Sequence, residues 1–332
     1  MSLRDEAAAG PRPPPPGSPV AVALDLGGTN LKGGLVGPGG TLVGLGVRET
    51  RADKGYESVL GSLAGFVADL RAEAQRRELT VVGLGVGTPG PLNRAAGIVE
   101  FAPNLGWSQA PLAGDLARLT GVRGVRLEND ANAAAFAEAW VGEGSGARCL
   151  LGVTLGTGVG AGLVVGGRLF TGATGVATEL GHVIVRPEGR ACRCGSKGCV
   201  EAYFSAWALV ERCREHAADH PDHSLDLARL TPEDVFDASL RGDPLAGPVL
   251  DFGLRSLALA LAGCLNLLNP DRVVFFGGLS ARWESFGPAL VEHVRTRSLP
   301  AAFSATRFSA SKLEWAGVLG VGGLVLSQTP DL

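Results

Sequence analysis

Three cysteines and a histidine are the residues of this sequence whose chemistry is easiest to interpret. Cys192, Cys194 and Cys199 lie close together in CRCGSKGCVE, and His182 precedes them in ELGH. Three thiolates and one imidazole form a complete tetrahedral ligand set for Zn²⁺, and a set with no open position is typical of structural zinc. The sequence therefore predicts a structural zinc motif over residues 182–201. The downstream segment CREHAADHPDH leaves four alternative donors of the fourth ligand, although His182 is favoured: Cys213, His216, His220 and His223.

Two glycine-rich segments have the residue types that bind phosphate. In Asp25-Leu-Gly-Gly-Thr-Asn30, backbone N–H groups of a tight turn can point at phosphate oxygens, and Asp25 can hold Mg²⁺ through water. An ordinary Gly-Gly hairpin explains this segment equally well. Residues 155–162 (LGTGVGAG) superficially match a dinucleotide-binding fingerprint, which requires a helix after the loop. The following LVVGGRLF favours a strand instead, so we expect a second phosphate-binding hairpin, with the two loops facing each other.

A carboxylate at a strand-to-helix junction is the candidate for proton transfer. Asp130 lies in ENDAN, where it could simply be the helix N-cap. At the mouth of a nucleotide site it could also accept the proton of an attacking hydroxyl, and the two roles are compatible. Near the C-terminus, Gly277 and Gly278 end a buried strand, where an adenine or ribose could approach the backbone. A strand followed by a tight turn is an equally good interpretation of that segment.

Length and composition restrict the class of protein. A chain of 332 residues fits two ordinary domains, and a formal net charge of -3 with 19% charged residues fits neither a disordered chain nor a polybasic nucleic-acid binder. The apolar stretch 257–268 is shorter than the roughly 20 residues of a membrane span, so none is expected. Residues 1–19 are Pro-rich, with Asp5 and Glu6 where a signal peptide would be positive. We expect a short disordered tail on a cytoplasmic protein.

The hydrophobic periodicity predicts the elements that position these residues. From Val20, three apolar runs separated by GGTN and GPGG predict a three-strand meander. A helix over 56–77 follows, and then strand 80–87, helix 111–121, strand 124–129 and helix 131–140. The pattern restarts at Cys149 with three strands, and later come a helix ending before Asn269, a buried strand at 272–278 and a helix around 288–297. Repeated use of one α/β plan predicts two similar lobes with a cleft between them.

The chain from Val20 onward resembles the ROK family of bacterial sugar kinases and repressors, and most of all its glucokinases. The motifs that carry the resemblance occur in the family's order: DLGGTN, GTPG, NLGW, ENDANAAA, LGTGVGAG, ELGH and CRCGSKGCVE. The resemblance implies the α/β, two-lobed actin-like ATPase fold of sugar kinases and Hsp70. A small N-terminal lobe would span 20–128 and include a returning C-terminal helix at 316–332, and a large lobe at 129–315 would carry the zinc motif.

The same resemblance implies a kinase that transfers the γ-phosphoryl group of Mg·ATP to the C6 hydroxyl of glucose, with Asp130 as general base. The hexose would be held by Gly90, Asn104, Asn129, Asp130, Glu179, His182 and Glu201. The nucleotide and Mg²⁺ would be held by Asp25, Gly27, Gly28, Thr29, Asn30, Lys32, Gly156, Thr157, Gly158, Gly277 and Gly278. His182 would serve both zinc and sugar, one through each ring nitrogen, so the metal would orient a substrate ligand.

Two other functions stay open from the sequence. The acceptor could be another hexose or N-acetylhexosamine, such as N-acetylmannosamine, N-acetylglucosamine, mannose, fructose or allose. The protein could also be a non-catalytic sugar sensor of the ROK repressor type. About 19 residues precede the first predicted strand, so we expect no DNA-binding domain and no nucleic-acid partner. The resemblance also implies a homodimer or homotetramer.

Overall fold

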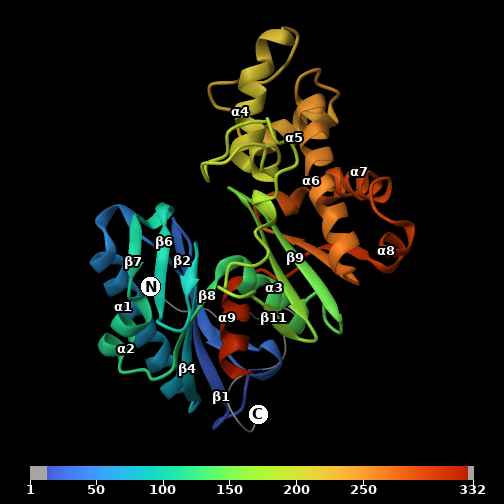
Figure 1. The fold of residues 1–332 in the computed structure, drawn as a ribbon. Helices are drawn as coiled ribbons and strands as arrows, with labels where there is room; N and C mark the ends of the chain where they lie inside the picture. Colours follow the sequence, from blue (N-terminus) through green and yellow to red (C-terminus); the bar gives the residue numbers. More distant parts are fainter. Residues whose placement is uncertain (1–12, 328–332) are drawn as a thin grey trace. The chain divides into compact units, whose positions relative to one another are not determined.

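The computed structural model describes residues 13–327 and divides into two units (Figure 1). The first unit runs up to Gly146 and includes Gly167–Ala177 and the residues from Leu313 onward; the second comprises Ala147–Gly166 and Thr178–Lys312. Most of the tail predicted at 1–19 and the end of the helix predicted at 316–332 lie outside the described residues. The last part of that tail contacts the fold, because Gly17 donates its N–H to the Glu78 carbonyl over 2.7 Å.

A five-stranded sheet with the order β3-β2-β1-β4-β8 forms the centre of the first unit. β1, β2 and β3 are antiparallel, as the predicted meander requires, and β4 and β8 continue the sheet in parallel. A small sheet with the order β5-β6-β7, which the periodicity did not predict, follows β4 in the chain. The strands span Pro19–Leu26 (β1), Asn30–Val36 (β2), Leu42–Glu49 (β3), Thr80–Thr88 (β4), Leu92–Asn93 (β5), Ile98–Ala102 (β6), Trp107–Ala110 (β7) and Val125–Asn129 (β8).

Alternation along β1 explains how helices cover both faces of this sheet. Val22 and Leu24 pack with side chains of α1 (Tyr56–Arg76) and α2 (Leu112–Thr120). Ala21 and Ala23 point to the other face, because successive strand side chains alternate, and pack with α3 and α9. α3 spans Asp130–Val141, and α9 spans Ala316–Leu326.

Helix α3 belongs to the first unit, whereas the sequence analysis placed residues from 129 onward in the second lobe. The division falls after Gly146 because α3 packs closely against α9. A Cβ atom on Gly320 of α9 would lie 1.8 Å from the Ala133 carbonyl oxygen, so the two helices approach more closely than a side chain there would permit. α9 itself is buried along almost its whole length, from Val318 to Leu326.

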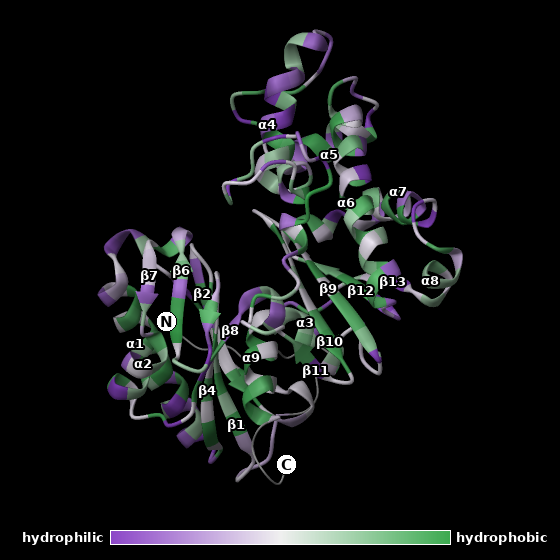
Figure 2. Ribbon diagram, in the orientation of Figure 1, coloured by the Kyte–Doolittle hydropathy of each residue, from purple (hydrophilic) through white to green (hydrophobic). Residues whose placement is uncertain are grey.

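The second unit contains a sheet with the order β11-β10-β9-β12-β13. β9 (Cys149–Leu155) pairs antiparallel with β10 (Val159–Val165) and parallel with β12 (Arg272–Phe276), which pairs with β13 (Arg307–Ala310). β11 spans Arg168–Phe170. Figure 2 shows the hydrophobic colouring of β9, β10 and β12. The helices span Ala206–His216 (α4), Pro232–Leu240 (α5), Ala246–Leu268 (α6), Trp283–Arg295 (α7) and Pro300–Ala305 (α8).

Helix α7 begins earlier than the sequence predicted, at Trp283 rather than near Pro288. Proline favours the first turn of a helix, which is why the periodicity indicated a start there. In the structure Pro288 lies inside the helix, and Phe286, two residues before it, is fully buried in the core of the second unit. The burial of this aromatic side chain therefore extends the helix toward its N-terminus.

Helix α6 is the one described helix that is long and apolar enough, by length and composition, to cross a membrane. The apolar stretch 257–268 is the last half of this helix. Of the most apolar window of this helix, 61% is buried inside the protein. Leu254, Leu257, Leu261 and Leu265 recur at helical spacing and pack into the core of the second unit, which is the pattern of a core helix.

Candidate active site

The first glycine segment is a hairpin turn with an exposed tip. Gly27 donates its N–H to the Asn30 carbonyl over 2.9 Å, and Thr50 supports the turn by donating its hydroxyl to the Gly27 carbonyl over 2.7 Å. Gly28, Thr29 and Asn30 are exposed. Within residues 13–327, the N–H groups of Gly28 and Thr29 have no protein acceptor. The predicted hairpin is confirmed, and its tip offers the backbone donors that an anion requires.

Asp25 lies at the end of β1 beside this turn. It is opposite Lys32 on β2 and Gly87 on β4. A Cβ on Gly317, at the start of α9, would lie 2.5 Å from the Asp25 carboxylate, so only glycine permits this approach. Burial raises the pKa of Asp25, and the Lys32 ammonium group lowers it in part. A bound cation would therefore stabilise the ionised carboxylate of Asp25.

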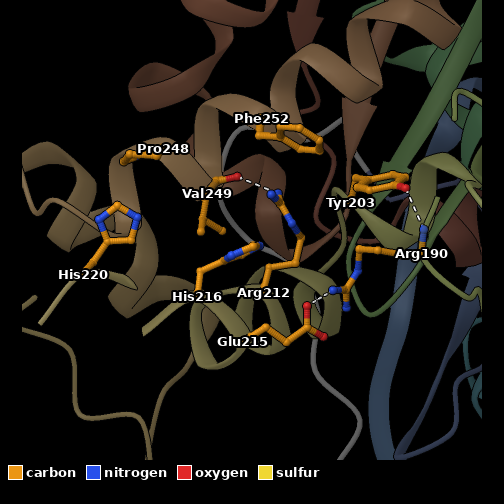
Figure 3. A pocket seen from close by; sticks show the side chains of 9 residues that line it. All are labelled: Arg190, Tyr203, Arg212, Glu215, His216, His220, Pro248, Val249 and Phe252. Carbon is orange, nitrogen blue, oxygen red and sulfur yellow. Dashed lines mark hydrogen bonds and ion pairs between the residues drawn. The ribbon is translucent and has the colours of Figure 1, made fainter. Parts of the chain in front are cut away.

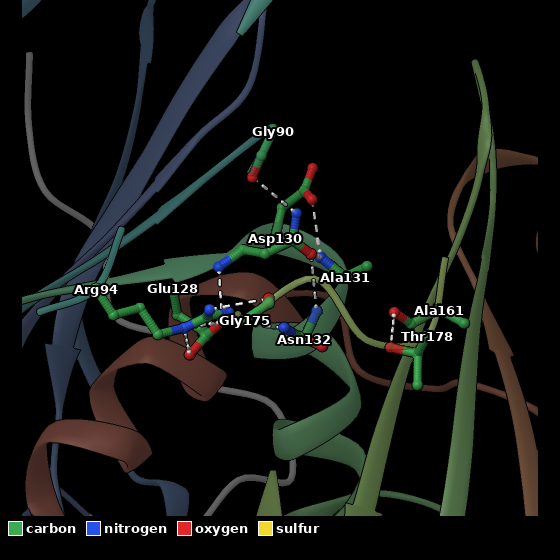
Figure 4. A network of polar contacts seen from close by, with 10 residues as sticks. Gly90, Arg94, Glu128, Asp130, Ala131, Asn132, Ala161, Gly175 and Thr178 are labelled. Atoms are coloured by element: carbon green, nitrogen blue, oxygen red, sulfur yellow. Dashed lines mark hydrogen bonds and ion pairs between the residues drawn. The ribbon is translucent and has the colours of Figure 1, made fainter. Parts of the chain in front are cut away.

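The start of helix α3 corrects one sequence interpretation and positions Asp130. Asn129, rather than Asp130, is the N-cap, because its extended backbone lets its Oδ1 accept the N–H groups of Ala131 and Asn132 at 3.0 and 3.2 Å. Asp130 is the first helical residue and is exposed, and its Oδ1 accepts the Ala131 N–H over 2.8 Å. Figure 4 shows this carboxylate pointing away from the helix on the side of Gly90.

A buried ion pair beneath Asp130 was not predicted from the sequence. The Glu128 side chain is 1% exposed, and Arg94 Nε donates to its Oε2 over 2.9 Å while Nη2 pairs with Oε1. Glu128 also accepts the Asn129 N–H at 2.9 Å and the Asn132 side-chain amide at 3.0 Å. Arg94 Nη1 donates to the Gly175 carbonyl over 3.0 Å (Figure 4). The sequence feature that could have indicated this ion pair is a glutamate inside a buried strand, because a buried carboxylate requires a partner.

Two further predicted sugar-binding residues of the first unit lie next to these segments. Gly90 has a φ of 89°, and a Cβ there would lie 2.0 Å from the Phe101 carbonyl oxygen, so no other residue fits. Its carbonyl accepts the Asn129 side-chain amide over 3.5 Å. Asn104 lies against the first glycine turn, with its Cβ 3.7 Å from the position a Cβ would take on Gly28. The first unit therefore links Gly90 with Asn129, and Asn104 with the glycine turn.

In the second unit, both segments predicted to bind nucleotide lie at one end of the sheet. Gly156–Gly158 forms the β9–β10 turn, with Gly156 donating its N–H to the Gly158 carbonyl over 3.0 Å. The strand that follows confirms the hairpin and the rejection of a dinucleotide fold. Gly277 and Gly278 follow β12, which runs parallel to β9, and a Cβ on Gly277 would lie 2.6 Å from the Leu155 carbonyl oxygen. Ligands commonly bind at the carboxyl ends of such parallel strands.

The remaining predicted sugar-binding residues are Glu179, His182 and Glu201, which lie in or next to the predicted zinc motif. A Glu201 carboxylate oxygen accepts the Val159 N–H over 3.0 Å, which joins the end of the motif to the turn. His182 donates its N–H to the Glu179 carbonyl over 3.0 Å in a short 3₁₀ helix, Leu180–His182. The second unit therefore holds Glu179 and His182 in one turn and fixes Glu201 against the glycine segment.

The geometry of the cysteine cluster fits a tetrahedral metal. The ligand atoms of His182, Cys192, Cys194 and Cys199 all lie within 4.8 Å of one another. The sulfurs of Cys194 and Cys199 are 3.8 Å apart, and the Cys192 sulfur is 3.8 Å from His182 Nδ1. Two sulfurs bound to tetrahedral zinc at about 2.3 Å would be about 3.8 Å apart.

The donors downstream of the motif are outside this cluster. Cys213 is fully buried, and burial raises the pKa of its thiol to about 11. His216 and His220 instead line a separate cavity, which is described below. Among the described residues, the four-ligand set is thus the one that the sequence favoured, with His182 as the fourth member.

Comparison with known proteins identifies the family. Residues 21–328 match the family model described as "ROK family". A glucokinase from Thermotoga maritima is 38% identical over 92% of this chain and 96% of its own length. The crystal structure of a ROK hexokinase from Thermus thermophilus matches 93% of this chain and 100% of its own, with a TM-score of 0.80 and 31% identity. A ROK glucokinase from Streptomyces griseus, crystallised with glucose and AMPPNP, has a TM-score of 0.74 and 28% identity, covering 93% of this chain and 99% of its own.

The fold is thus the actin-like ATPase α/β fold of ROK sugar kinases, as the sequence indicated. The chain belongs to the ROK family. Other relatives in this family are named for different functions. An N-acetylmannosamine kinase from Escherichia coli O7:K1 is 30% identical over 93% of this chain and 99% of its own. A xylose repressor from Caldicellulosiruptor bescii is 29% identical over 82% of this chain and 69% of its own length.

Proposed function

We propose that this protein is an ATP-dependent hexose kinase that transfers the γ-phosphoryl group of ATP to the C6 hydroxyl of glucose. Its family membership and its similarity to glucokinases make it a sugar kinase. The choice of glucose as acceptor is supported by two glucokinases that are 38% and 34% identical to this chain. We further propose that it acts in the cytoplasm.

The observation that carries this proposal is the position of Asp130. Its carboxylate is exposed on the first turn of α3, and the Ala131 N–H fixes its orientation. The buried Glu128 lies directly beneath it and is held by Arg94. Proton abstraction by a positioned side chain typically contributes about 10²–10⁴-fold to a rate. Asp130 would accept the proton of the C6 hydroxyl as that oxygen attacks the γ-phosphorus and the bond to ADP breaks.

Phosphate binding would use the exposed donors of the two glycine turns. The N–H groups of Gly28 and Thr29 in the first unit supply one set. Gly156–Gly158 and the neighbouring Gly277 and Gly278 would hold the rest of the nucleotide. Mg²⁺, held through water near Asp25, would neutralise charge on the transferred phosphoryl group. Asn30 and Lys32 complete the proposed nucleotide set.

The proposed sugar-binding residues are polar side chains that each unit holds in place by itself. Asn104, Asn129 and Asp130 come from the first, together with the backbone of Gly90. Glu179, His182 and Glu201 come from the second. A structural zinc on His182, Cys192, Cys194 and Cys199 would fix the ring of His182, so that its second nitrogen can face a hydroxyl.

The test is an ADP-release assay with Mg·ATP against glucose, mannose, N-acetylglucosamine, N-acetylmannosamine, fructose and allose. Asp130→Asn should lower kcat by about 10²–10⁴-fold, because the amide cannot accept the proton. Asp222→Asn, the same change at an exposed position of the second unit, serves as the matched control and should keep full activity. Near-normal turnover by Asp130→Asn on every sugar would contradict the assignment of the base.

Phosphorylation of an N-acetylhexosamine is the second candidate function. The observation that favours it is the 30% identity to an N-acetylmannosamine kinase over nearly the whole chain. A site that hydrogen-bonds substrate hydroxyls rejects an analogue lacking them by about 10⁴–10⁵-fold, so the sugar panel should show one dominant acceptor. Sugar binding without ADP release from any sugar would favour the sensor function instead.

A further inference from the structure

A cavity of about 500 Å³ lies in the second unit, outside the proposed sugar, nucleotide and zinc residues (Figure 3). Three segments supply its walls: Arg190 and Tyr203 in and just after the predicted zinc motif, helix α4 with the turn after it, and the first two turns of helix α6. Its volume is within the range of about 300–1,000 Å³ found for small-molecule pockets. It is lined by Arg190, Tyr203, Arg212, Glu215, His216, His220, Pro248, Val249 and Phe252.

The most informative residue of this cavity is Arg212, a buried cation without an anionic partner. It is 5% exposed, and Nη1 donates to the Val249 carbonyl over 3.0 Å. Its guanidinium carbon lies 4.3 Å from the centre of the Phe252 ring and 5.9 Å from that of Tyr203. Among residues 13–327, no carboxylate forms an ion pair with it, and its other nitrogens have no hydrogen-bond acceptor.

A buried guanidinium group in this state has unused binding capacity. Arginine carries five N–H donors, and the protein accepts from one nitrogen here. Burial lowers the pKa of Arg212 to about 10, so it still carries its charge at neutral pH. Burying an uncompensated charge is costly, and cation–π contacts recover only part of that cost. An anion that enters the cavity would supply the missing negative charge and the missing hydrogen-bond acceptors for Arg212.

The charged side chains that line the cavity are two arginines, Arg190 and Arg212, and one carboxylate, Glu215. Arg190 pairs with Glu215 and lies 3.7 Å from Glu211, which also pairs with Arg193, so both carboxylates are already engaged by arginines other than Arg212. Arg186 stacks on the Phe252 ring at 4.3 Å and, within the described part of the chain, has no ion pair. His216 Nδ1 lies 3.7 Å from a carboxylate oxygen of Asp219, which follows it in the chain. Arg186 and Arg212 therefore flank one aromatic ring without neutralising carboxylates.

We propose that this cavity binds a small phosphate-bearing molecule, with the phosphate group on the free N–H groups of Arg212. Guanidinium groups recognise phosphate oxygens in paired, charge-assisted hydrogen bonds. The cavity is larger than a phosphate ion, and Tyr203, Phe252 and Val249 provide an apolar wall for the organic part of the ligand. The inference is independent of the proposed hexose kinase reaction, because it uses none of the residues assigned to that reaction.

The structure also indicates where such a ligand would act. The hydroxyl of Tyr203 accepts the N–H of Arg190 over 2.8 Å, and Arg190 Nε donates to the Ala202 carbonyl over 3.1 Å. These bonds join the cavity wall to the backbone that carries Cys192, Cys199 and Glu201. Glu201 in turn binds the N–H of Val159. A ligand on Arg212 would therefore contact the same segment that holds the proposed zinc and sugar residues.

The test is isothermal titration of inorganic phosphate and of glycerol 3-phosphate, at constant ionic strength and with saturating AMPPNP and Mg²⁺ present. Arg212→Met and His216→Glu should each weaken binding by about tenfold or more, because one removes the cation and the other adds a negative charge. Ala218→Glu adds the same charge at an exposed position that does not line the cavity, and should leave affinity within about twofold. His216→Glu keeps the test decisive if Arg212→Met does not fold.

Three results of the titrations, and one of a crystal soak, would overturn the proposal. The first is the absence of saturable binding of both probes up to about 10 mM. The second is equal affinity in wild type and His216→Glu. The third is phosphate binding that is seen only when AMPPNP is left out, which would place the ligand in the nucleotide site. A crystal soaked with tungstate, with its anomalous signal at Arg212, would support the assignment directly, whereas a signal only at the glycine turns would contradict it.

Discussion

Replacing Arg94 by methionine tests the network that positions Asp130. The substitution removes the cation from Glu128, whose side chain is 1% exposed, and keeps a similar aliphatic volume. Removing one partner of a buried ion pair costs about 3–5 kcal/mol, because the other charge stays buried and uncompensated. Glu128 would still accept two N–H groups, from Asn129 and Asn132, so we expect about 3 kcal/mol, at the lower end of this range.

The control is Arg118→Met, which makes the same change in an exposed ion pair of the same unit. Arg118 pairs with Asp115 at 3.0 Å, and its side chain is 67% exposed. Exposed pairs contribute about 0–1 kcal/mol, so this variant should be nearly as stable as wild type. Urea unfolding followed by circular dichroism measures the difference, and hydrogen exchange of the α3 amides shows whether the loss is local.

A second substitution separates charge from packing. Glu128→Gln added to Arg94→Met removes the buried negative charge but keeps a side-chain oxygen for the Asn129 and Asn132 donors. The double variant should therefore be more stable than Arg94→Met alone. Equal stability of Arg94→Met and Arg118→Met, or no recovery in the double variant, would refute the argument that an uncompensated charge causes the loss.

Three more predictions follow from the site. Because burial raises the pKa of Asp25 in the folded state, the folded protein retains a proton that the unfolded chain loses, so stability should fall as pH rises from the ordinary aspartate range toward neutrality. Asp25→Asn should lack this component of the melting profile and lose Mg·ATP turnover; an unchanged profile would argue against the burial. Mass spectrometry should find one zinc ion per chain, which should be absent in Cys199→Ser and retained in Cys264→Ser. Folded protein from which the metal has been removed should bind sugar about 10–100-fold more weakly. Undiminished sugar affinity would separate the metal from the sugar site. Gly90→Ala should lower the melting temperature through a loss of about 1–3 kcal/mol and raise KM for the sugar, since its φ is 89°; wild-type melting would contradict the strain.

Features that depend on neighbouring residues were predictable from the sequence. The meander that begins with β1, the turns at Gly27–Gly28 and Gly156–Gly158, and the candidate zinc ligands follow from local periodicity, turn chemistry and short spacing. The second glycine segment shows this well, because the strand-forming residues after it were enough to exclude a dinucleotide fold. These signals are local, and tertiary packing did not reverse them.

The N-cap of helix α3, in the segment ENDAN, could not be predicted from neighbouring residues. Asp and Asn are both good N-caps, so the sequence could not separate Asn129 from Asp130. The extended backbone at Asn129 decides it, and it leaves Asp130 exposed on the helix. The position of α3 in the first unit likewise depends on α9, whose Gly320 meets Ala133 nearly two hundred residues away along the chain.

The sequence by itself determined the class of fold, the glycine turns and the identity of the candidate zinc ligands. Only the tertiary structure decided that Glu128 pairs with Arg94, that Gly317 packs against Asp25, and that Arg212 remains buried without a carboxylate. The physical reason is that a buried charge is stabilised or left uncompensated by residues distant in the chain. Periodicity predicts which residues are buried, and only the packed structure shows which residues they contact.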